Sequence, residues 1–96
     1  MTLLLLNAKF PVGQVVTTQG ALEALRQSEQ SPLEFLQRHA SGDWGEMDEG
    51  DRQENEYALH KPLRLFSAYH TNLGEKLWVI TEADRSATTF LLPAEY

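Results

Sequence analysis

The chain has 96 residues, of which 42% are hydrophobic, so it is long enough to build one hydrophobic core and too short for two. Eight Lys and Arg residues stand against fourteen Asp and Glu residues, and the formal charge of −6 disfavours a direct complex with nucleic acid. Cysteine is absent from the sequence, which excludes disulfides, thiolate nucleophiles and cysteine-based zinc sites and favours a reducing cytoplasm.

The N-terminal residues predict a β-hairpin. Leu3–Phe10 is typical of a strand rather than of a signal peptide or a membrane span, because its run of leucines stops at Asn7 and no basic region precedes it. Pro11 and Gly13 favour a turn into a second strand over Gln14–Thr17.

Two helices are predicted next. The first covers Gln19–Arg26 with Thr18 as its N-cap, and its apolar positions recur at helical spacing at Ala21, Leu22 and Leu25. The second begins with a strong start signal, in which a serine N-cap is followed by proline and by the glutamate of a capping box: Ser31, Pro32 and Glu34. Gly42 is placed to end this helix, whose apolar stripe is Leu33, Leu36 and Ala40 with Phe35 and His39 alongside.

A third helix and three strands complete the predicted elements. Asp48 is a suitable N-cap for a mostly polar helix over Glu49–His60, which Pro62 ends. The remaining apolar runs predict a meander of strands at Leu63–His70, Leu77–Thr81 and Thr88–Leu92. We therefore expect a single α+β domain over residues 1–96. An antiparallel sheet of four to five strands, formed by the N-terminal hairpin and the C-terminal meander, packs with about three helices.

Several motifs are spread over nearly the whole chain: Arg38-His39, Gly42-Asp43-Trp44-Gly45, Asp51, Asn55, Ser67-Ala68-Tyr69, Trp78–Ser86, Thr88-Thr89, Leu91-Leu92-Pro93 and Glu95-Tyr96. Together they resemble a family of small bacterial proteins that are carried mainly on plasmids, prophages and integrative elements. The label of type I restriction subunit is sometimes attached to that family, but the chain is far too short for such a subunit and has no methyltransferase or nuclease motif. The resemblance implies a setting, the accessory functions of mobile elements, rather than a mechanism.

A small set of polar residues supports a catalytic hypothesis: His39, Glu82, Asp84 and Arg85. His39 lies four residues before Asp43, so it fits a general base oriented by a carboxylate, a pair of metal ligands, or a structural histidine near its helix end. Arg85 fits a ligand for phosphate or for a transition-state charge, with Glu82 or Asp84 transferring the proton.

The structural interpretation of these residues is the one we favour. Arg85 then pairs with one of the carboxylates of Asp84, Glu82 or Asp43 and fixes the turn between the last two strands. Glu82, Asp84 and Arg85 thus form a structural hub of the sheet, and neither a metal site nor a cofactor is expected.

Acidic residues are concentrated in one segment. Between Asp43 and Glu56 seven acidic residues stand beside one basic residue, Arg52, and seven minus one gives a local charge of −6, the charge of the whole chain. Such a segment is typical of a solvated helix face, but it also fits a surface that imitates nucleic-acid phosphates or attracts a basic partner. Trp44 is either an exposed anchor for that partner or, as we favour, a core side chain. The candidate partner-binding residues are Asp43, Trp44, Glu46, Asp48, Glu49, Asp51 and Glu54.

The leading functional hypothesis is a small cytoplasmic mobile-element protein that binds and modulates or inhibits a protein of the host or of a competing element. Anti-restriction or anti-CRISPR activity is its most concrete form. The alternative is a metal-independent ribonuclease or toxin that uses His39, Arg85 and a carboxylate. Neither direct binding of nucleic acid nor a membrane is expected, and assembly of copies through an exposed sheet edge is a third hypothesis.

Overall fold

The computed structural model describes residues 7–96, which form three α-helices, four strands and one short 3-10 helix. In chain order these elements are β1 (Gln14–Thr17), α1 (Gln19–Gln27), α2 (Pro32–Ala40), α3 (Glu49–Ala58), β2 (Leu65–His70), β3 (Lys76–Thr81), β4 (Ala87–Leu91) and η1 (Pro93–Glu95). The predicted α+β class is confirmed, as are the three helices.

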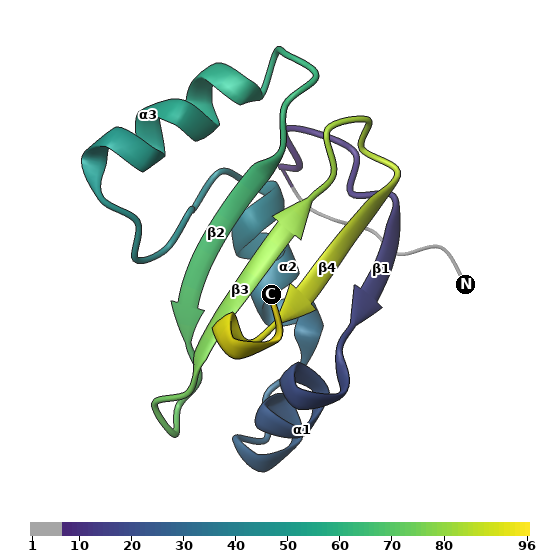
Figure 1. The fold of residues 1–96 in the computed structure, drawn as a ribbon, viewed down its shortest axis with the longest axis vertical. Coiled ribbons are helices and arrows are strands. Elements are labelled where there is room, and N and C mark those ends of the chain that lie inside the picture. Colours follow the sequence, from purple (N-terminus) through teal and green to yellow (C-terminus); the bar gives the residue numbers. More distant parts are fainter. Residues whose placement is uncertain (1–6) are drawn as a thin grey trace.

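The four strands form one mixed sheet in the order β1-β4-β3-β2 (Figure 1). The last three strands are the predicted antiparallel meander, with Ser67 opposite Val79 and Val79 opposite Phe90. At one edge β1 pairs with β4 in parallel, which places Val15 opposite Thr88.

The prediction of an antiparallel N-terminal hairpin is wrong for the described residues. Leu3–Leu6 lie outside the described part of the chain, and residues 7–10 form no strand. Phe10 is buried against Trp44, and the N–H of Lys9 bonds the carbonyl of Ala40 at the end of α2. The chain therefore reaches β1 from the α2 side, and the long helical connection after β1 permits the parallel pairing with β4.

Local sequence signals place the helices correctly. The side chains of the three predicted N-caps each accept a hydrogen bond from a backbone N–H of their helix, namely Thr18 from Ala21, Ser31 from Leu33 and Asp48 from Asp51. Two details differ from the prediction. The Glu34 carboxylate accepts from the side chain of Gln30, and Leu22 is 54% exposed, whereas Ala24 is buried in its place.

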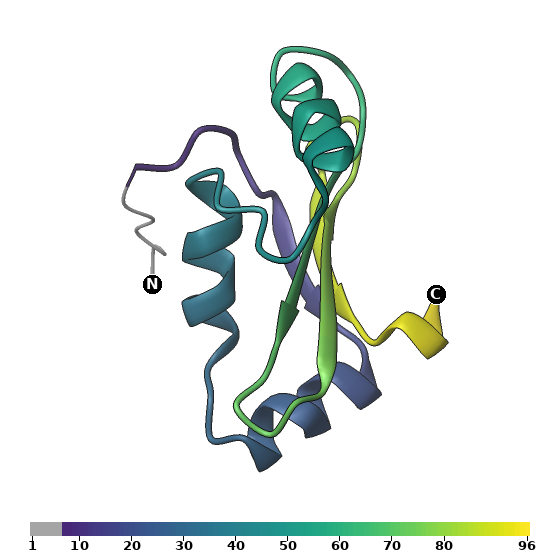
Figure 2. The ribbon, with the colours of Figure 1, turned by 90° about the vertical axis from the view of Figure 1, so that its left-hand side faces the viewer.

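One face of the sheet carries the main core, and Figure 2 shows which helices lie on the two sides of the sheet. Helix α2 covers this face, α1 lies beyond one end of the strands, and η1 lies on the opposite face. The core combines residues of α1, α2 and three strands: Ala21, Leu25, Phe35, Leu36, Tyr69, Leu77, Val79 and Phe90. A second cluster, Phe10, Trp44, Ala58 and Leu65, lies where α3 approaches β2.

Candidate functional site

Helix α3 is fastened to the edge strand β2 by one side chain, Asn55. Its amide nitrogen donates to the carbonyl of Phe66 at 2.6 Å, and its amide oxygen accepts from the N–H of Phe66 at 3.0 Å. Asn55 is only 4% exposed, so these two hydrogen bonds are formed away from solvent. The side chain therefore pairs with β2 as the peptide group of a neighbouring strand would.

The segment between α2 and α3 continues this pairing along β2. The carbonyl of Trp44 accepts from the N–H of Ala68 at 3.1 Å, and the N–H of Glu46 donates to the carbonyl of Ala68 at 2.7 Å. Together with the Asn55 amide, this segment occupies the outward backbone groups of Phe66 and Ala68. The β2 edge is thus closed to further strands over these residues.

Replacing Asn55 with Asp should destabilise the protein strongly. The carboxylate would face the carbonyl of Phe66 without a proton to donate, and a buried charge would replace a neutral amide. We expect a loss of about 2–4 kcal/mol in the free energy of unfolding, measured by urea denaturation. Gln53→Glu makes the same charge change on the exposed side of α3, so it should change this free energy by less than about 0.5 kcal/mol. Equal losses in the two variants would show that charge, and not the Asn55 pairing, is responsible.

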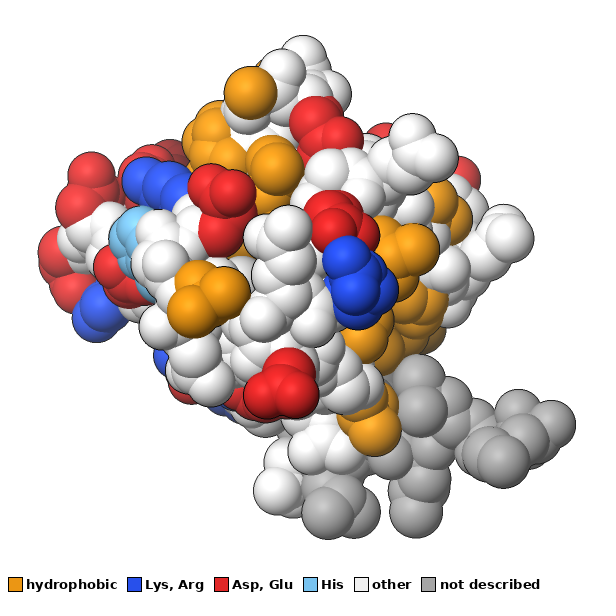
Figure 3. All heavy atoms as spheres, turned by 90° about the horizontal axis from the view of Figure 1, so that it is seen from below, with side chains coloured by type: hydrophobic (Ala, Val, Ile, Leu, Met, Phe, Trp, Pro, Cys, Tyr) orange, Lys and Arg blue, Asp and Glu red, His pale blue; other side chains and the backbone are white. Residues whose placement is uncertain are grey.

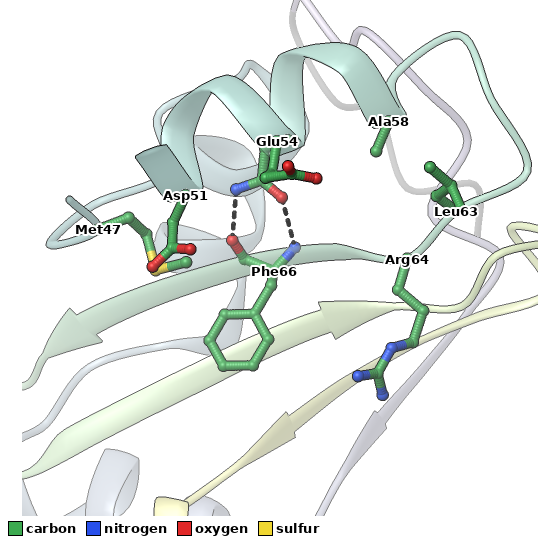
Figure 4. Close-up of a pocket in the computed structure, with 8 residues that line it drawn as sticks. Met47, Asp51, Glu54, Ala58, Leu63, Arg64 and Phe66 are labelled. Atoms are coloured by element: carbon green, nitrogen blue, oxygen red, sulfur yellow. Dashed lines mark hydrogen bonds between the residues drawn. The ribbon is translucent and has the colours of Figure 1, made fainter. Parts of the chain in front are cut away.

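A groove lies between α3 and β2 (Figure 4). Its volume is about 400 Å³, and it is lined by Met47, Asp51, Glu54, Asn55, Ala58, Leu63, Arg64 and Phe66. Figure 4 shows Asp51 on the side of α3 that is turned toward β2, Leu63 near Ala58 beyond the end of α3, and the side chains of Arg64 and Phe66 extending from the β2 side away from α3. The lining therefore combines apolar side chains with the carboxyl-bearing residues Asp51 and Glu54 of α3 and with Arg64 from the segment before β2.

The candidate acidic residues differ in whether another group forms a hydrogen bond or an ion pair with their carboxylate. Asp43 pairs with Arg38 at 2.8 Å, and this hydrogen bond holds the pKa of the Asp43 carboxyl below its usual value. Glu46 contacts the His70 ring at 2.6 Å, and the Asp48 carboxylate caps α3. The remaining three, Glu49, Asp51 and Glu54, lie on the exposed surface of α3.

Within residues 7–96, no hydrogen bond or ion pair reaches the carboxylate of Asp51 or Glu54, whereas Glu49 accepts one from Gln53. Of the six candidate acidic residues, the two that no described residue compensates are therefore the two that line the groove.

Trp44 is a core residue and offers no exposed anchor. Its side chain is only 4% exposed, and its ring stacks on Phe10 with a centroid distance of 6.2 Å. The indole N–H donates to the carboxylate of Glu56 at 3.3 Å. Trp44 thus fixes the connection between α2 and α3, and we remove it from the candidate contact surface.

His39 is fully buried between α2 and the sheet, away from the acidic partner that the sequence offered. Its Nδ1 atom lies 2.5 Å from the hydroxyl of Ser67, and its Nε2 atom lies 2.9 Å from the hydroxyl of Thr81. Asp43, the expected orienting carboxylate, pairs with Arg38 instead. Burial lowers the pKa of His39 to about 3, so the ring is neutral at physiological pH.

The hydroxyl groups around His39 fix its tautomer. Thr88 donates to the carbonyl of Val12 at 2.7 Å, so its hydroxyl must accept from Thr81, which lies 2.7 Å away. Thr81 has then used its proton and accepts from Nε2–H of His39, while Nδ1 accepts from Ser67. The chain of hydrogen bonds joins α2, β2, β3, β4 and the segment before β1, which is a structural role.

Arg85 binds backbone carbonyls rather than a carboxylate. Its Nη1 atom donates to the carbonyls of Leu63, Ala83 and Glu82, and its Nη2 atom donates to those of Ala58 and Lys61, over distances of 2.6–3.3 Å. The expected pairing with Asp84, Glu82 or Asp43 is thus wrong. Arg85 instead holds the C-terminal end of α3 and the following loop against the β3–β4 turn.

The two acidic residues of this turn are exposed and do not converge with His39. Hydrogen bonding from the Ser86 side chain, and then from its backbone N–H at 3.0 Å, lowers the pKa of the Asp84 carboxyl, and Glu82 contributes its carbonyl to the turn. The Phe10 ring packs edge-on against the ring of His39, and its centre lies 5.9 Å from the guanidinium carbon of Arg85. His39 and Arg85 thus share Phe10 as a neighbour, but each is held by its own hydrogen-bond partners.

Sequence reasoning missed the groove and the side chain that builds it. Asn55 appeared only as part of a motif, although an asparagine inside a helix was a usable signal, because its amide favours hydrogen bonds to a nearby backbone. The sequence places Arg64 and Phe66 only within the predicted strand Leu63–His70, and nothing in their spacing relates them to α3.

Comparison with known proteins adds no identification, since no protein-family model, curated protein or solved structure matches the chain. The resemblance to mobile-element proteins therefore stays a prediction. Over residues 7–96, no helix has the length and hydrophobicity to cross a membrane. Among the same residues, no three His, Asp or Glu side chains are grouped so that they could hold a metal ion.

Proposed function

We propose that the protein is a non-enzymatic binding protein that holds a basic segment of another protein in the α3–β2 groove. The observation that supports this most directly is the placement of Asp51 and Glu54, two carboxylates of the acidic segment that no described residue compensates, in the lining of the groove. A Lys or Arg side chain of the partner pairs with these carboxylates, while a neighbouring apolar side chain packs against Met47 and Leu63.

The distribution of charge supports the same surface. The segment from Asp43 to Glu56 carries the whole net charge, and the rest of the chain has seven acidic and seven basic residues. A basic partner is therefore attracted toward α3 over the distance that ionic screening permits. Because Asp43 and Glu46 have partners of their own, the contact surface is narrower than the acidic segment.

The setting of the proposed function comes from the resemblance to plasmid, prophage and integrative-element proteins. It favours a cytoplasmic partner from the host or from a competing element. Restriction and CRISPR proteins carry Lys- and Arg-lined surfaces for nucleic acid, which an acidic groove complements. Inhibition follows when the small protein occupies such a surface.

The contacts of His39 and Arg85 count against the ribonuclease alternative. A general base must reach the proton that it removes, whereas the ring of His39 is fully buried and both of its nitrogens are hydrogen-bonded. The guanidinium of Arg85 is likewise engaged by carbonyls. We therefore do not assign a catalytic role to either residue.

The test is partner capture from the host, followed by binding measurements with the purified partner. The double variant Asp51→Asn, Glu54→Gln should weaken binding by about tenfold to a hundredfold, because two partly desolvated charge pairs are lost. Raising the salt concentration should weaken the wild-type complex in the same direction.

The matched control is Glu49→Gln, Glu75→Gln, which removes two exposed carboxylates outside the groove. It should change the affinity by less than about threefold, since exposed rim charges contribute little. If both double variants weaken binding equally, net charge rather than the groove is responsible. If neither does, the partner binds elsewhere and the proposal is wrong.

A further inference from the structure

The two edges of the sheet differ in the way their backbone groups are satisfied. At the β2 edge, Asn55 and the segment before α3 occupy the outward groups. At the β1 edge, the N–H of Gln14 donates to the carbonyl of Ser86, and the N–H of Thr18 donates to the carbonyl of Phe90 in β4. The alternation of a parallel ladder therefore turns Val15 and Thr17 outward. No hydrogen bond from another residue in the range 7–96 reaches the outward N–H and C=O groups of these two residues.

The side chains of β1 do nothing to prevent pairing with another strand. Edge strands are usually protected by charged residues, proline or bulges, and β1, with the sequence Gln-Val-Val-Thr, has none of these. Val15 is 39% exposed and Val16 is 41% exposed, and Leu22 on the helix that follows directly is 54% exposed. Figure 3 shows hydrophobic side chains on the side of the molecule on which β1 lies in Figure 1, and others elsewhere on the same face.

We infer that β1 pairs antiparallel with β1 of a second copy of this chain, so that two sheets join into one across a twofold axis. Val15 and Thr17 turn their backbone groups outward. Val15 of one copy therefore exchanges two backbone hydrogen bonds with Thr17 of the second copy, and Thr17 of the first copy does the same with Val15 of the second. Val16 then lies opposite its own counterpart on the axis. All three cross-strand pairs are formed by β-branched side chains, which stabilise sheets.

The distribution of charge favours a second copy as the occupant of this edge. Two chains of charge −6 repel each other, but the excess acid lies in the segment that contains α3, at the opposite edge of the sheet (Figure 1). Pairing through β1 keeps the two acidic helices far apart and brings together surfaces of balanced charge. It also leaves both α3–β2 grooves open, so the inference is independent of the proposed function.

The test is sedimentation of the full-length protein over a wide range of concentration, combined with amide hydrogen exchange. A concentration-dependent dimer is expected, and its formation should protect the amides of Val15 and Thr17. The amide of Val16 should be protected at every concentration, since it bonds to β4. A protein that stays monomeric up to millimolar concentration overturns the inference. So does protection of Val15 and Thr17 that does not depend on concentration, which would mean that the edge is covered within one chain.

Val16→Lys provides the decisive variant, because it brings two ammonium groups together on the twofold axis while its exposed position preserves the monomer fold. The dissociation constant of the dimer should rise by about tenfold or more. Leu73→Lys is the matched control, with the same kind of change at a 70% exposed position in the β2–β3 loop, and dimerisation should be unaffected. A dimer that persists in Val16→Lys, or that is lost in Leu73→Lys, would show that another surface joins the copies.

Discussion

Lowering the pH from 7 to 5 should destabilise the folded protein through one buried side chain, His39. The folded state holds this ring neutral with a pKa of about 3, because burial penalises the charged form. In the unfolded chain the pKa returns to about 6.5, so the unfolded state binds a proton that the folded state excludes. The contribution of the neutral ring to stability is complete above pH 6.5 and is lost progressively as the pH falls toward 3.

The size of the expected change in the free energy of unfolding follows from the uptake of one proton by His39 when the protein unfolds. The free energy of unfolding should fall by about 1.4 kcal/mol for each pH unit below about 6.5, or about 2 kcal/mol by pH 5. This is a large share of the roughly 5–15 kcal/mol that stabilises a domain. Urea denaturation at several pH values, followed by tryptophan fluorescence, measures the slope, since Trp44 is buried in the folded state. Carboxylates titrate at lower pH, so the slope between pH 6.5 and 5 reports on histidine side chains.

Two variants identify the residue responsible for this slope. His39→Gln removes the titrating ring while keeping a polar side chain near Ser67 and Thr81, so its stability should be lower at pH 7 but nearly constant down to pH 5. His60→Gln replaces an exposed histidine and should keep the slope of the wild type. If His39→Gln keeps the full slope, another group titrates and the assignment to His39 is wrong.

Features that depend on neighbouring residues could be predicted from the sequence. The caps Thr18, Ser31 and Asp48 act on backbone N–H groups within three residues, so their spacing alone identifies the helix starts. The meander was equally local, because short turns join its strands in antiparallel order. In β2 the side chains of Leu65, Ser67 and Tyr69 share the buried face, as expected because successive side chains of a strand point to opposite faces of the sheet.

Features that depend on distant segments could not be predicted in the same way. The pairing of β1 with β4 joins residues more than seventy positions apart, such as Val15 and Thr88, and a turn signal after Phe10 wrongly favoured a hairpin. The role of His39 depends on hydroxyls contributed by two strands, and none of them is near it in the sequence. The groove requires that Asn55 meet Phe66, and helix periodicity does not specify which strand a polar position faces.

Replacing Arg85 with Ala should cost about 2–4 kcal/mol of unfolding free energy, because five carbonyl groups lose a charged donor at once. One of these carbonyls, that of Ala58, belongs to the last residue of α3, where a cation also complements the helix dipole, and that of Lys61 lies in the loop that follows. The loss should therefore be concentrated in α3, and amide hydrogen exchange should become faster in this helix than in α2. The exposed Arg26, which pairs only with Glu23, is the matched control, and Arg26→Ala should change stability by less than about 0.5 kcal/mol.

The variant Arg85→Gly separates the contribution of the Arg85 side chain to stability from the cost of its backbone conformation. Arg85 has a φ of +63°, a conformation that costs an ordinary residue about 1 kcal/mol and glycine almost nothing. Arg85→Gly should thus be about 1 kcal/mol more stable than Arg85→Ala and still less stable than the wild type. If Arg85→Ala is as stable as Arg26→Ala but binds the partner more weakly, then Arg85 contacts a ligand instead of stabilising the fold. Loss of both stability and α3 protection supports the role that the carbonyl contacts indicate, in which Arg85 holds one wall of the groove in place.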